Sequence, residues 1–207
     1  MTKTDLTKLY KTYYQASKNP EIIELGAAQY LSLVGKGDPS AQAFTDNIQA
    51  LYATAYAIKF QCKEAGHDFV VPKLEALWWF DATKYNNLSI AATPLKVPRS
   101  EWEYRLLIRM PDFVTGAAVT AAIAAVVHKK QLVKAQDIEL FSYWEGKCVQ
   151  VLHVGPFDRE PETLEQIAAF SALKGLVKRG LHHEIYLSDF RKTPQERLKT
   201  ILREPVF

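Results

Sequence analysis

The 207-residue chain contains only two cysteines, Cys62 and Cys148, which form neither a disulfide framework nor a CxxC metal motif. Such sparse use of cysteine suits a reducing cytoplasm, which we predict as the compartment. The N-terminal residues MTKTDLTKLYKTYYQ lack the apolar core of a signal peptide. The longest apolar run, 114–127, is interrupted by threonine and glycine and is too short to span a bilayer. We therefore expect no membrane partner.

An excess of charge of one sign is also missing. The chain carries 26 basic and 23 acidic residues, a net charge of +3, and its basic residues are scattered along the sequence. Proteins that bind nucleic acid usually concentrate positive charge on one face. We therefore expect no nucleic-acid partner.

Hydrophobic and aromatic residues are well represented. A hydrophobic content of 48% is ordinary for a globular protein and supplies a core. Aromatic residues make up 12% of the chain and include four tryptophans. Aromatic side chains build cores, but on strands they also line ligand pockets. The composition therefore leaves both a well-packed interior and a ligand site open.

Hydrophobic periodicity predicts helices and strands in alternation. In the helix expected over 40–64, one apolar stripe at the 3.6-residue period consists of Phe44, Ile48, Leu51, Ala55 and Ile58. The expected helices cover residues 4–16, 40–64 (with Asp38 as N-cap and Gly66 as C-cap), 111–130 and 161–178 (with Gly180 as C-cap). The expected strands cover residues 22–34 (with a possible break at Gly26), 74–81, 101–110, 182–187 and, as an edge strand, the C-terminal part of 194–207. Residues 137–154 are typical of a hairpin that turns at Glu145-Gly146-Lys147.

The two halves of the chain repeat the same order of elements. YLSLVGKGDPS (30–40) matches VQVLHVGPFDREPE (149–162), LEALWWFD (74–81) matches HHEIYLSD (182–189), and LLIRMP matches TILREP. We therefore predict an α+β fold of two tandem βαββ repeats with antiparallel sheets, related by a pseudo-two-fold axis. The bare faces of the two sheets either pack together or leave a ligand cleft between the repeats. The predicted units are a helical leader (1–20), a first repeat (21–111), a linker helix (112–136) and a second repeat (137–207).

Four motifs carry a resemblance to a known family: GKGDP (35–39), LHVGPFDREPET (152–163), HHEIYLSD (182–189) and LKTILREPV (198–206). With these motifs the chain resembles the GyrI-like small-molecule-binding family, which shares its domain with multidrug-sensing transcription regulators. No helix-turn-helix pattern is present, so the chain is similar to a stand-alone member. The resemblance implies a ligand cleft between the repeats, with aromatic walls and a buried glutamate, and Glu184 occupies the matching position.

The residues around Glu184 support this interpretation on physical grounds. A carboxylate on a buried strand face must be paired, protonated or reserved for a ligand, whereas on an edge strand it simply faces water. Strand alternation places Tyr186 on the same face as Glu184. We predict Glu184 and Tyr186 as catalytic residues.

Further aromatic residues and one histidine are candidates for the walls of the site. Trp78 and Trp79 point to opposite faces of one strand, and Trp78 is favoured because it aligns with Tyr186 in the repeat. For each candidate, ordinary packing is the alternative. The predicted ligand-binding residues are Trp78, Trp79, Trp102, Tyr104, Tyr143, His153 and Phe157.

A subgroup of the stand-alone family members, which this chain resembles closely, hydrolyses cyclopropane-bearing, DNA-alkylating natural products. The resemblance implies that Glu184 orients or deprotonates a water molecule, while Tyr186, Tyr143 or a histidine donates to the developing phenolate. The expected partner is therefore a flat, hydrophobic or cationic xenobiotic, and hydrolysis would protect the cell. Two alternatives stay open, a non-catalytic sequestering protein and a topoisomerase-modulating interaction protein. A monomer and a homodimer are equally compatible with the sequence.

Three other patterns do not favour a different chemistry. His182 and His183 are adjacent on a strand and point to opposite faces, so they are poorly placed to share a metal ion. Cys148 and His153 are five residues apart, which argues against a Cys–His nucleophile pair. GKGDPS lacks the spacing of a phosphate-binding loop. We therefore predict neither a metal nor a cofactor.

Overall fold

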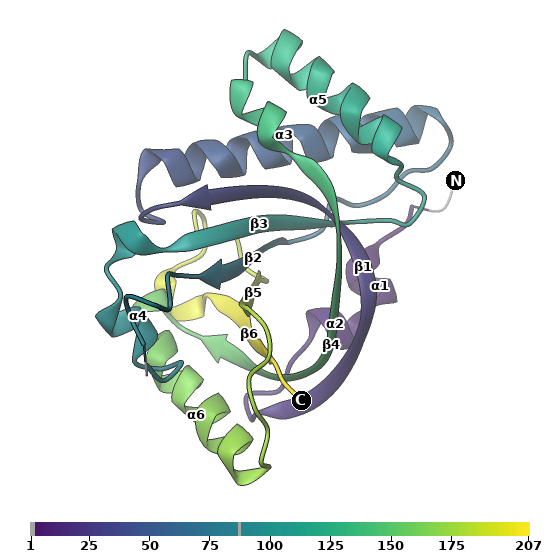
Figure 1. The fold of residues 1–207 in the computed structure, drawn as a ribbon. Coiled ribbons are helices and arrows are strands. Elements are labelled where there is room, and N and C mark those ends of the chain that lie inside the picture. The colour runs from purple at the N-terminus through teal and green to yellow at the C-terminus, as the bar shows by residue number, and fades with distance from the viewer. Residues whose placement is uncertain (1–2, 87) are drawn as a thin grey trace.

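The computed structural model describes residues 3–86 and 88–207, and its elements follow the order β-α-β-β twice (Figure 1). The single-turn helices α1 (Leu6–Leu9) and α2 (Lys11–Tyr14) come first. The first repeat consists of β1 (Glu21–Lys36), α3 (Gln42–Glu64), β2 (Leu74–Trp79) and β3 (Glu103–Met110). The second consists of β4 (Glu139–Val154), α6 (Glu160–Leu173), β5 (His182–Tyr186) and β6 (Lys199–Pro205). The connections contain α4 (Thr93–Lys96), α5 (Gly116–Lys130), η1 (Arg99–Glu101), η2 (Val133–Asp137), η3 (Phe157–Arg159) and η4 (Gln195–Arg197).

The strands pair antiparallel in the order β1-β3-β2-β5-β6-β4 and close into a barrel. This order is symmetric, because β1, β3 and β2 occupy the places that β4, β6 and β5 occupy in the other half. The repeats therefore meet along two seams, one between β2 and β5 and one between β1 and β4. The predicted α+β fold of two βαββ repeats is confirmed.

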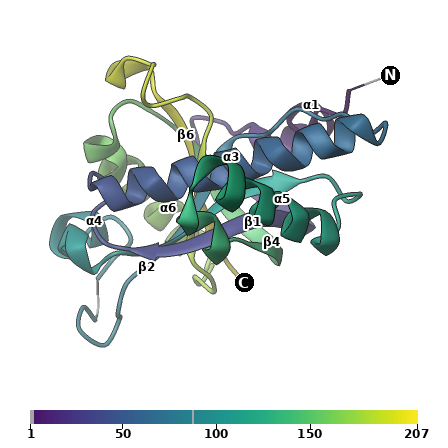
Figure 2. The same ribbon diagram turned by 90° about the horizontal axis from the view of Figure 1, so that it is seen from above.

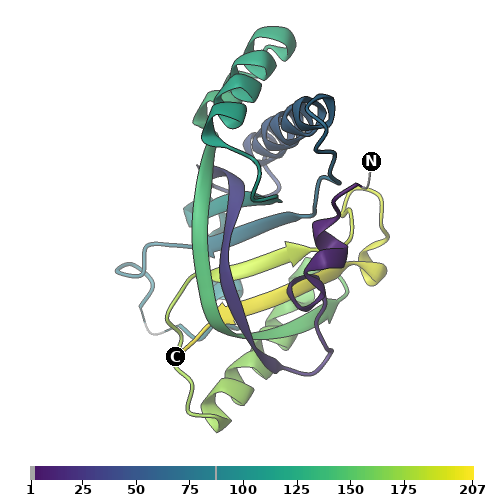
Figure 3. The same ribbon diagram turned by 90° about the vertical axis from the view of Figure 1, so that its right-hand side faces the viewer.

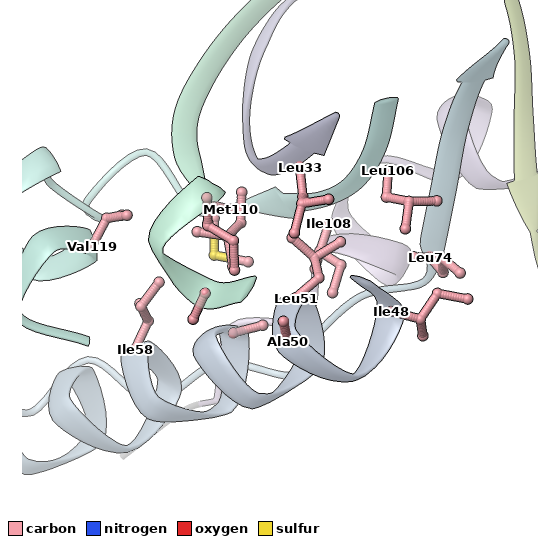
Figure 4. Close-up of a cluster of buried hydrophobic side chains, with 14 of the residues drawn as sticks. Leu33, Ile48, Ala50, Leu51, Ile58, Leu74, Leu106, Ile108, Met110 and Val119 are labelled. Carbon is pink, nitrogen blue, oxygen red and sulfur yellow. The ribbon is translucent and has the colours of Figure 1, made fainter. Parts of the chain in front are cut away.

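Helices cover the outer face of each repeat. Figure 2 shows α5 alongside α3, and Figure 3 shows these two helices on one side of the barrel with α6 on the other. The predicted apolar stripe of α3 is buried, and Figure 4 shows Ile48, Leu51 and Ile58 on the side of α3 that is turned toward the sheet. Burial of one such leucine or isoleucine contributes about 1.5–3 kcal/mol. The stripe consists of Phe44, Ile48, Leu51, Ala55 and Ile58.

The structure confirms one of the two caps that the sequence predicts for α3. Gly66 follows the helix with φ +88°, and the N–H groups of Gly66 and His67 donate to the carbonyls of Lys63 and Cys62. The predicted glycine cap is thus confirmed. Asp38 is not the N-cap, which is Ala41; its carboxylate instead accepts from the backbone N–H and the hydroxyl of Ser40 in the preceding turn.

The predicted hairpin over 137–154 is wrong, because these residues form the single long strand β4. Strand β4 pairs with β1 on both sides of Gly146, which has φ +66°. Leu25 and Ala28 of β1, three residues apart, both contact the same cluster, so the facing of the strand changes near Gly26. Gly26 and Gly146 thus mark a bend in two paired strands. The sequence pattern instead predicts a strand break at Gly26 and a hairpin turn at Gly146.

Other boundaries also differ from the prediction. The leader forms two short helices instead of one over 4–16. Helix α5 begins after the Thr115 side-chain cap, and α6 ends at Leu173, before the left-handed Gly175, so Gly180 is not its cap. The C-terminal strand β6 is not an edge, because it pairs with both β4 and β5.

The interior of the barrel contains an ionic network instead of a purely apolar core. The side chains of Glu75, His183 and Arg203 are fully buried there, and Glu145 is 2% exposed. His183 contacts Glu145 Oε1 through Nδ1 (2.7 Å) and Glu75 Oε2 through Nε2 (3.0 Å), and Arg203 Nη1 donates to Glu145 Oε2 at 3.0 Å. Two carboxylates thus face one guanidinium and one imidazole.

The leader completes this network from the open end of the barrel. Tyr13 donates its hydroxyl proton to Glu75, Tyr14 OH lies 3.4 Å from the second oxygen of Glu75, and Arg203 Nη2 donates to the Tyr13 carbonyl at 2.8 Å. The leader, β2 and β6 are therefore joined by buried hydrogen bonds.

The protonation states follow from these contacts. Burial alone would raise the pKa of Glu145, but His183 and Arg203 more than offset it and hold that pKa at about 2. Burial would lower the pKa of His183, but the Glu145 and Glu75 carboxylates raise it above its ordinary value. With His183 protonated, the four charges of the network cancel.

Replacing Arg203 by methionine should therefore lower the free energy of unfolding by about 3–5 kcal/mol, because Glu145 then loses a buried counter-charge. Urea denaturation followed by circular dichroism measures this change. The matched control is Arg159→Met, which breaks a solvent-exposed pair with Glu162 and should leave the free energy of unfolding close to that of the wild type. Equal losses in the two variants would contradict the role assigned to the network.

Candidate functional site

The outer face of β5 carries three polar side chains at the seam between the repeats. His182, Glu184 and Tyr186 alternate along the strand with the interior residues His183 and Ile185. In the seam, Glu184 lies opposite Ala76 of β2. The expectation that His182 and His183 point to opposite faces is confirmed, since one joins Glu184 and the other the interior network.

Hydrogen bonds fix both oxygens of Glu184. His182 Nε2 lies 3.2 Å from Oε1, and the Tyr186 hydroxyl donates to Oε2 at 2.6 Å. Trp78 Nε1 in turn donates to the Tyr186 hydroxyl at 3.3 Å. Each carboxylate oxygen can accept two hydrogen bonds. Glu184, with 12% of its side chain exposed, therefore keeps acceptor capacity for a water molecule or a ligand.

A second carboxylate, Glu204, keeps His182 protonated. His182 Nδ1 lies 2.6 Å from Glu204 Oε1, and Lys178 Nζ lies 2.6 Å from the other oxygen. Burial lowers the pKa of His182, but Glu204 and Glu184 more than offset this effect and raise that pKa to about 9. At neutral pH His182 is therefore an imidazolium that donates to both carboxylates.

Aromatic rings surround this polar chain in one continuous cluster. Trp78 stacks on Phe44 of α3 with ring centroids 5.9 Å apart and meets Tyr104 at 5.5 Å. On the other side of the seam, Tyr186 contacts Phe157 at 5.9 Å and Phe190 at 6.1 Å. We call this set the seam cluster; it comprises Phe44, Trp78, Trp102, Tyr104, Phe157, Tyr186 and Phe190.

A surface hollow of about 360 Å³ adjoins the seam cluster. Phe157 and Phe190 line the hollow and also contact the ring of Tyr186. Arg99, Asp158 and Gln195 contribute polar groups to its lining. These two phenylalanines therefore lie between solvent and the Tyr186–Glu184 pair.

Among the residues that the structure describes, two buried polar atoms near the seam cluster have no hydrogen-bond partner. Asn47 donates from Nδ2 to the Tyr104 hydroxyl at 3.0 Å, but its Oδ1 is unpartnered. Glu160, the first residue of α6, is 8% exposed, and its Oε1 is unpartnered too. Burial and the neighbouring Glu184 carboxylate raise the pKa of Glu160 well above its ordinary range. Both effects favour the protonated, neutral form of the Glu160 carboxyl group.

The structure separates the predicted site residues into two groups. Trp78, Trp102, Tyr104 and Phe157 belong to the seam cluster together with the predicted catalytic pair, Glu184 and Tyr186. The remaining candidates, which lie elsewhere, are Trp79, Tyr143 and His153.

Each of the three has a different environment. Trp79 follows Trp78 on β2 and so projects to the opposite face. Tyr143 stacks on Phe141 and packs against the interior cluster, on the other face from Glu184. The two ring nitrogens of His153 contact the Thr163 hydroxyl at 2.8 Å and the Pro156 carbonyl at 3.1 Å. His153 thereby holds the segment that carries Phe157 and Glu160.

The sequence interpretation missed several residues of this site. The sequence indicates Phe44 only as part of the apolar stripe of α3, and Phe190 lies just outside the motif HHEIYLSD (182–189). Glu160 directly precedes the helix expected over 161–178, and an acidic residue is ordinary at a helix start. The sequence treats His182 only as a poorly placed metal ligand, whereas its two carboxylate contacts give it an electrostatic role.

Two further observations concern the described residues alone. Within them, no three His, Cys, Asp or Glu side chains are arranged to hold a metal ion. None of the helices in residues 3–86 and 88–207 combines the length and the apolar character that crossing a bilayer requires.

Comparison with known proteins places the chain in a family. The model of the GyrI-like small molecule binding domain matches residues 107–206. An uncharacterized conserved protein from Listeria innocua is 36% identical, with a TM-score of 0.88 over 99% of this chain and 100% of that chain. A hydrolase from Listeria innocua is also 36% identical, with a TM-score of 0.86 over the whole of both chains. The chain belongs to the GyrI-like small-molecule-binding family.

A more distant match shares the fold and, at its low sequence identity, carries no information about chemistry. The EcmrR C-terminal domain shares the fold, with 10% identity and a TM-score of 0.59 over 91% of this chain and 97% of that chain. No curated protein sequence matches the chain. The predicted family is confirmed, and chemical arguments must come from the site itself.

The charge on His182 predicts a pH-dependent stability. Its pKa is raised from 6.5 to about 9 on folding, so its contribution is complete below pH about 6.5 and is lost as the pH rises toward about 9. The full shift corresponds to about 3 kcal/mol. His182→Gln should flatten the decline of the unfolding free energy between pH 6.5 and 9, measured by urea denaturation at each pH. The exposed His128→Gln is the control, and a His182→Gln curve as steep as the wild-type curve would refute the assignment.

Proposed function

We propose that this protein binds flat, hydrophobic or cationic xenobiotic molecules at the seam cluster and hydrolyses those that carry a strained cyclopropane ring. The observation that carries the proposal is the position of Glu184, a carboxylate with free acceptor capacity, against a continuous set of aromatic rings. The hydrolase from Listeria innocua, similar over its whole length, supports hydrolysis as the type of reaction.

The aromatic rings account for binding. Flat ligands gain contact area and stacking energy between rings, and a cation gains a further contribution from the ring faces. Phe157 and Phe190 stand beside the hollow, so a ligand would enter by displacing these two side chains. Both residues lie in connections between the main elements, where chains move most readily: Phe157 belongs to the short helix η3, and Phe190 follows β5.

Glu184 accounts for the reaction. In a cyclopropane conjugated to a dienone, water attacks a ring carbon, the strained C–C bond breaks, and its electron pair moves to the carbonyl oxygen. Glu184 takes the proton of the attacking water as a general base. Because His182 and Tyr186 hold both of its oxygens, this base is oriented before the substrate arrives. Ring opening destroys the alkylating group and so protects the DNA of the cell.

Glu184→Gln should slow turnover by about 100-fold or more, because glutamine keeps the shape but cannot accept the proton. Ligand affinity, read from quenching of tryptophan fluorescence, should stay close to that of the wild type. Turnover is measured by mass spectrometry as the conversion of a cyclopropane-bearing alkylator into its water adduct. The exposed Glu24→Gln serves as the matched control.

Two results would redirect the proposal. An unchanged rate in Glu184→Gln would remove Glu184 from the reaction. Tight binding with only intact ligand recovered from the wild-type protein would make this a sequestering protein that uses the same seam cluster.

A further inference from the structure

The reaction described above leaves one step without a donor. When the cyclopropane opens, negative charge develops on the carbonyl oxygen of the ligand, and a nearby acid that donates a proton lowers this barrier. The donor must lie near Glu184, because the ligand is held there, and it must have a proton that no other group already accepts.

The hydroxyl and imidazole groups near Glu184 are already engaged. Tyr186 gives its proton to Glu184, and burial together with the Glu184 carboxylate raises the pKa of Tyr186 well above 10. His182 donates from both nitrogens to Glu184 and Glu204. His153 is occupied by Thr163 and the Pro156 carbonyl.

Glu160 differs from these groups in its surroundings. Its side chain is buried at the first turn of α6, and its Oε1 has no hydrogen-bond partner among the described residues. Phe157, three residues before Glu160, contacts the ring of Tyr186 at 5.9 Å, and Glu160 interacts electrostatically with Glu184 and Tyr186. One turn further along α6, the Thr163 hydroxyl contacts His153 Nδ1 at 2.8 Å, and this contact fixes the start of the helix that carries Glu160.

The charges around Glu160 favour its neutral form. Arg159, which precedes it, pairs with Glu162 in solvent, with Nε and Nη2 at 3.0 and 2.9 Å from the carboxylate. The charged imidazole of His182 contacts Glu184 and Glu204 instead. The positive end of α6 favours an anion at this position, but burial and the Glu184 carboxylate outweigh it.

We infer that Glu160 is the proton donor of this site, a neutral carboxylic acid that protonates the carbonyl oxygen of the ligand while Glu184 deprotonates the attacking water. This inference rests on the proposed hydrolysis. It also defines the substrate class: a flat molecule whose strained ring reaches Glu184 and whose conjugated carbonyl oxygen reaches the N-terminal end of α6.

The step balances without an outside reagent. One C–O bond forms between water and the ring carbon, one strained C–C bond breaks, and the electron pair moves through the conjugated ring to the carbonyl oxygen. That oxygen takes the proton of Glu160, and Glu184 takes one proton from water. Return of this proton from Glu184 to Glu160, directly or through a water molecule, restores the starting state, and the net change is the addition of one water molecule to the ligand.

The kinetic test uses Glu160→Gln, which keeps the size and the neutral charge but has no acidic proton. With a cyclopropane-bearing alkylator, kcat should fall by about 100-fold or more while KM stays within about threefold of the wild type. In the wild type, kcat should decline at alkaline pH as Glu160 ionises, and the residual activity of Glu160→Gln should lack this decline. Glu165→Gln, on an exposed position of α6, is the matched control, and Glu160→Asp should restore part of the rate.

A second measurement reads the proton itself, without turnover. The infrared spectrum of the ligand-free wild-type protein at pH 7 should contain the carbonyl band of a protonated carboxylic acid. This band should be absent in Glu160→Gln and present in Glu184→Gln, because burial of Glu160 persists in the latter.

The possible outcomes separate the two proposals. Turnover by the wild type with a slow Glu160→Gln supports both. Equal turnover by the two proteins, or a wild-type spectrum without the acid band, overturns the role of Glu160 and leaves hydrolysis standing. Absence of turnover in the wild type overturns hydrolysis, and with it the catalytic role of Glu160, even when the acid band is present.

Discussion

The balance of charge inside the barrel is the constraint on which the rest of the structure depends. Glu75 and Glu145 come from different repeats, and each is buried where an isolated charge would be several kcal/mol unfavourable. His183 bridges them, and Arg203 ties Glu145 to the leader. Since the partners lie on β2, β4, β5 and β6, the network is satisfied only when both repeats and the leader are in place. It thus favours one closed arrangement over looser packings of the same strands.

Strand β5 connects this interior to the seam cluster on the outer face of the barrel. Alternation along the strand points His183 inward to the network and Glu184 outward to the seam cluster. The strand register that pairs His183 with its carboxylates therefore also fixes the position of Glu184. A shift by one residue would bury Glu184 and His182 among the interior charges and expose His183. The position of the base in the proposed reaction is therefore set by the same pairing that closes the barrel.

The sequence could predict what is encoded locally. The stripe of α3, the cap at Gly66 and the repeated β-α-β-β order all depend on neighbours within a few residues, and these predictions are confirmed. Gly146 shows the limit, because a glycine with positive φ can reverse a chain or bend a strand, and only the pairing with distant β1 decides. Glu160 has the same difficulty: an acid at a helix start is ordinary, and its burial beside Glu184 depends on how two repeats meet.

The symmetric strand order has a consequence for each repeat taken alone. The three strands of one repeat leave two unpaired edges, β1 and β2 in the first and β4 and β5 in the second, and both edges find partners only in the other repeat. Exposed edges of this kind promote association with other chains. A lone βαββ unit could therefore close such a barrel only as a two-fold dimer. Covalent linkage of two units replaces that association with an intramolecular one, and it allows the two halves to diverge, so that only one of them needs to carry the carboxylate of the site.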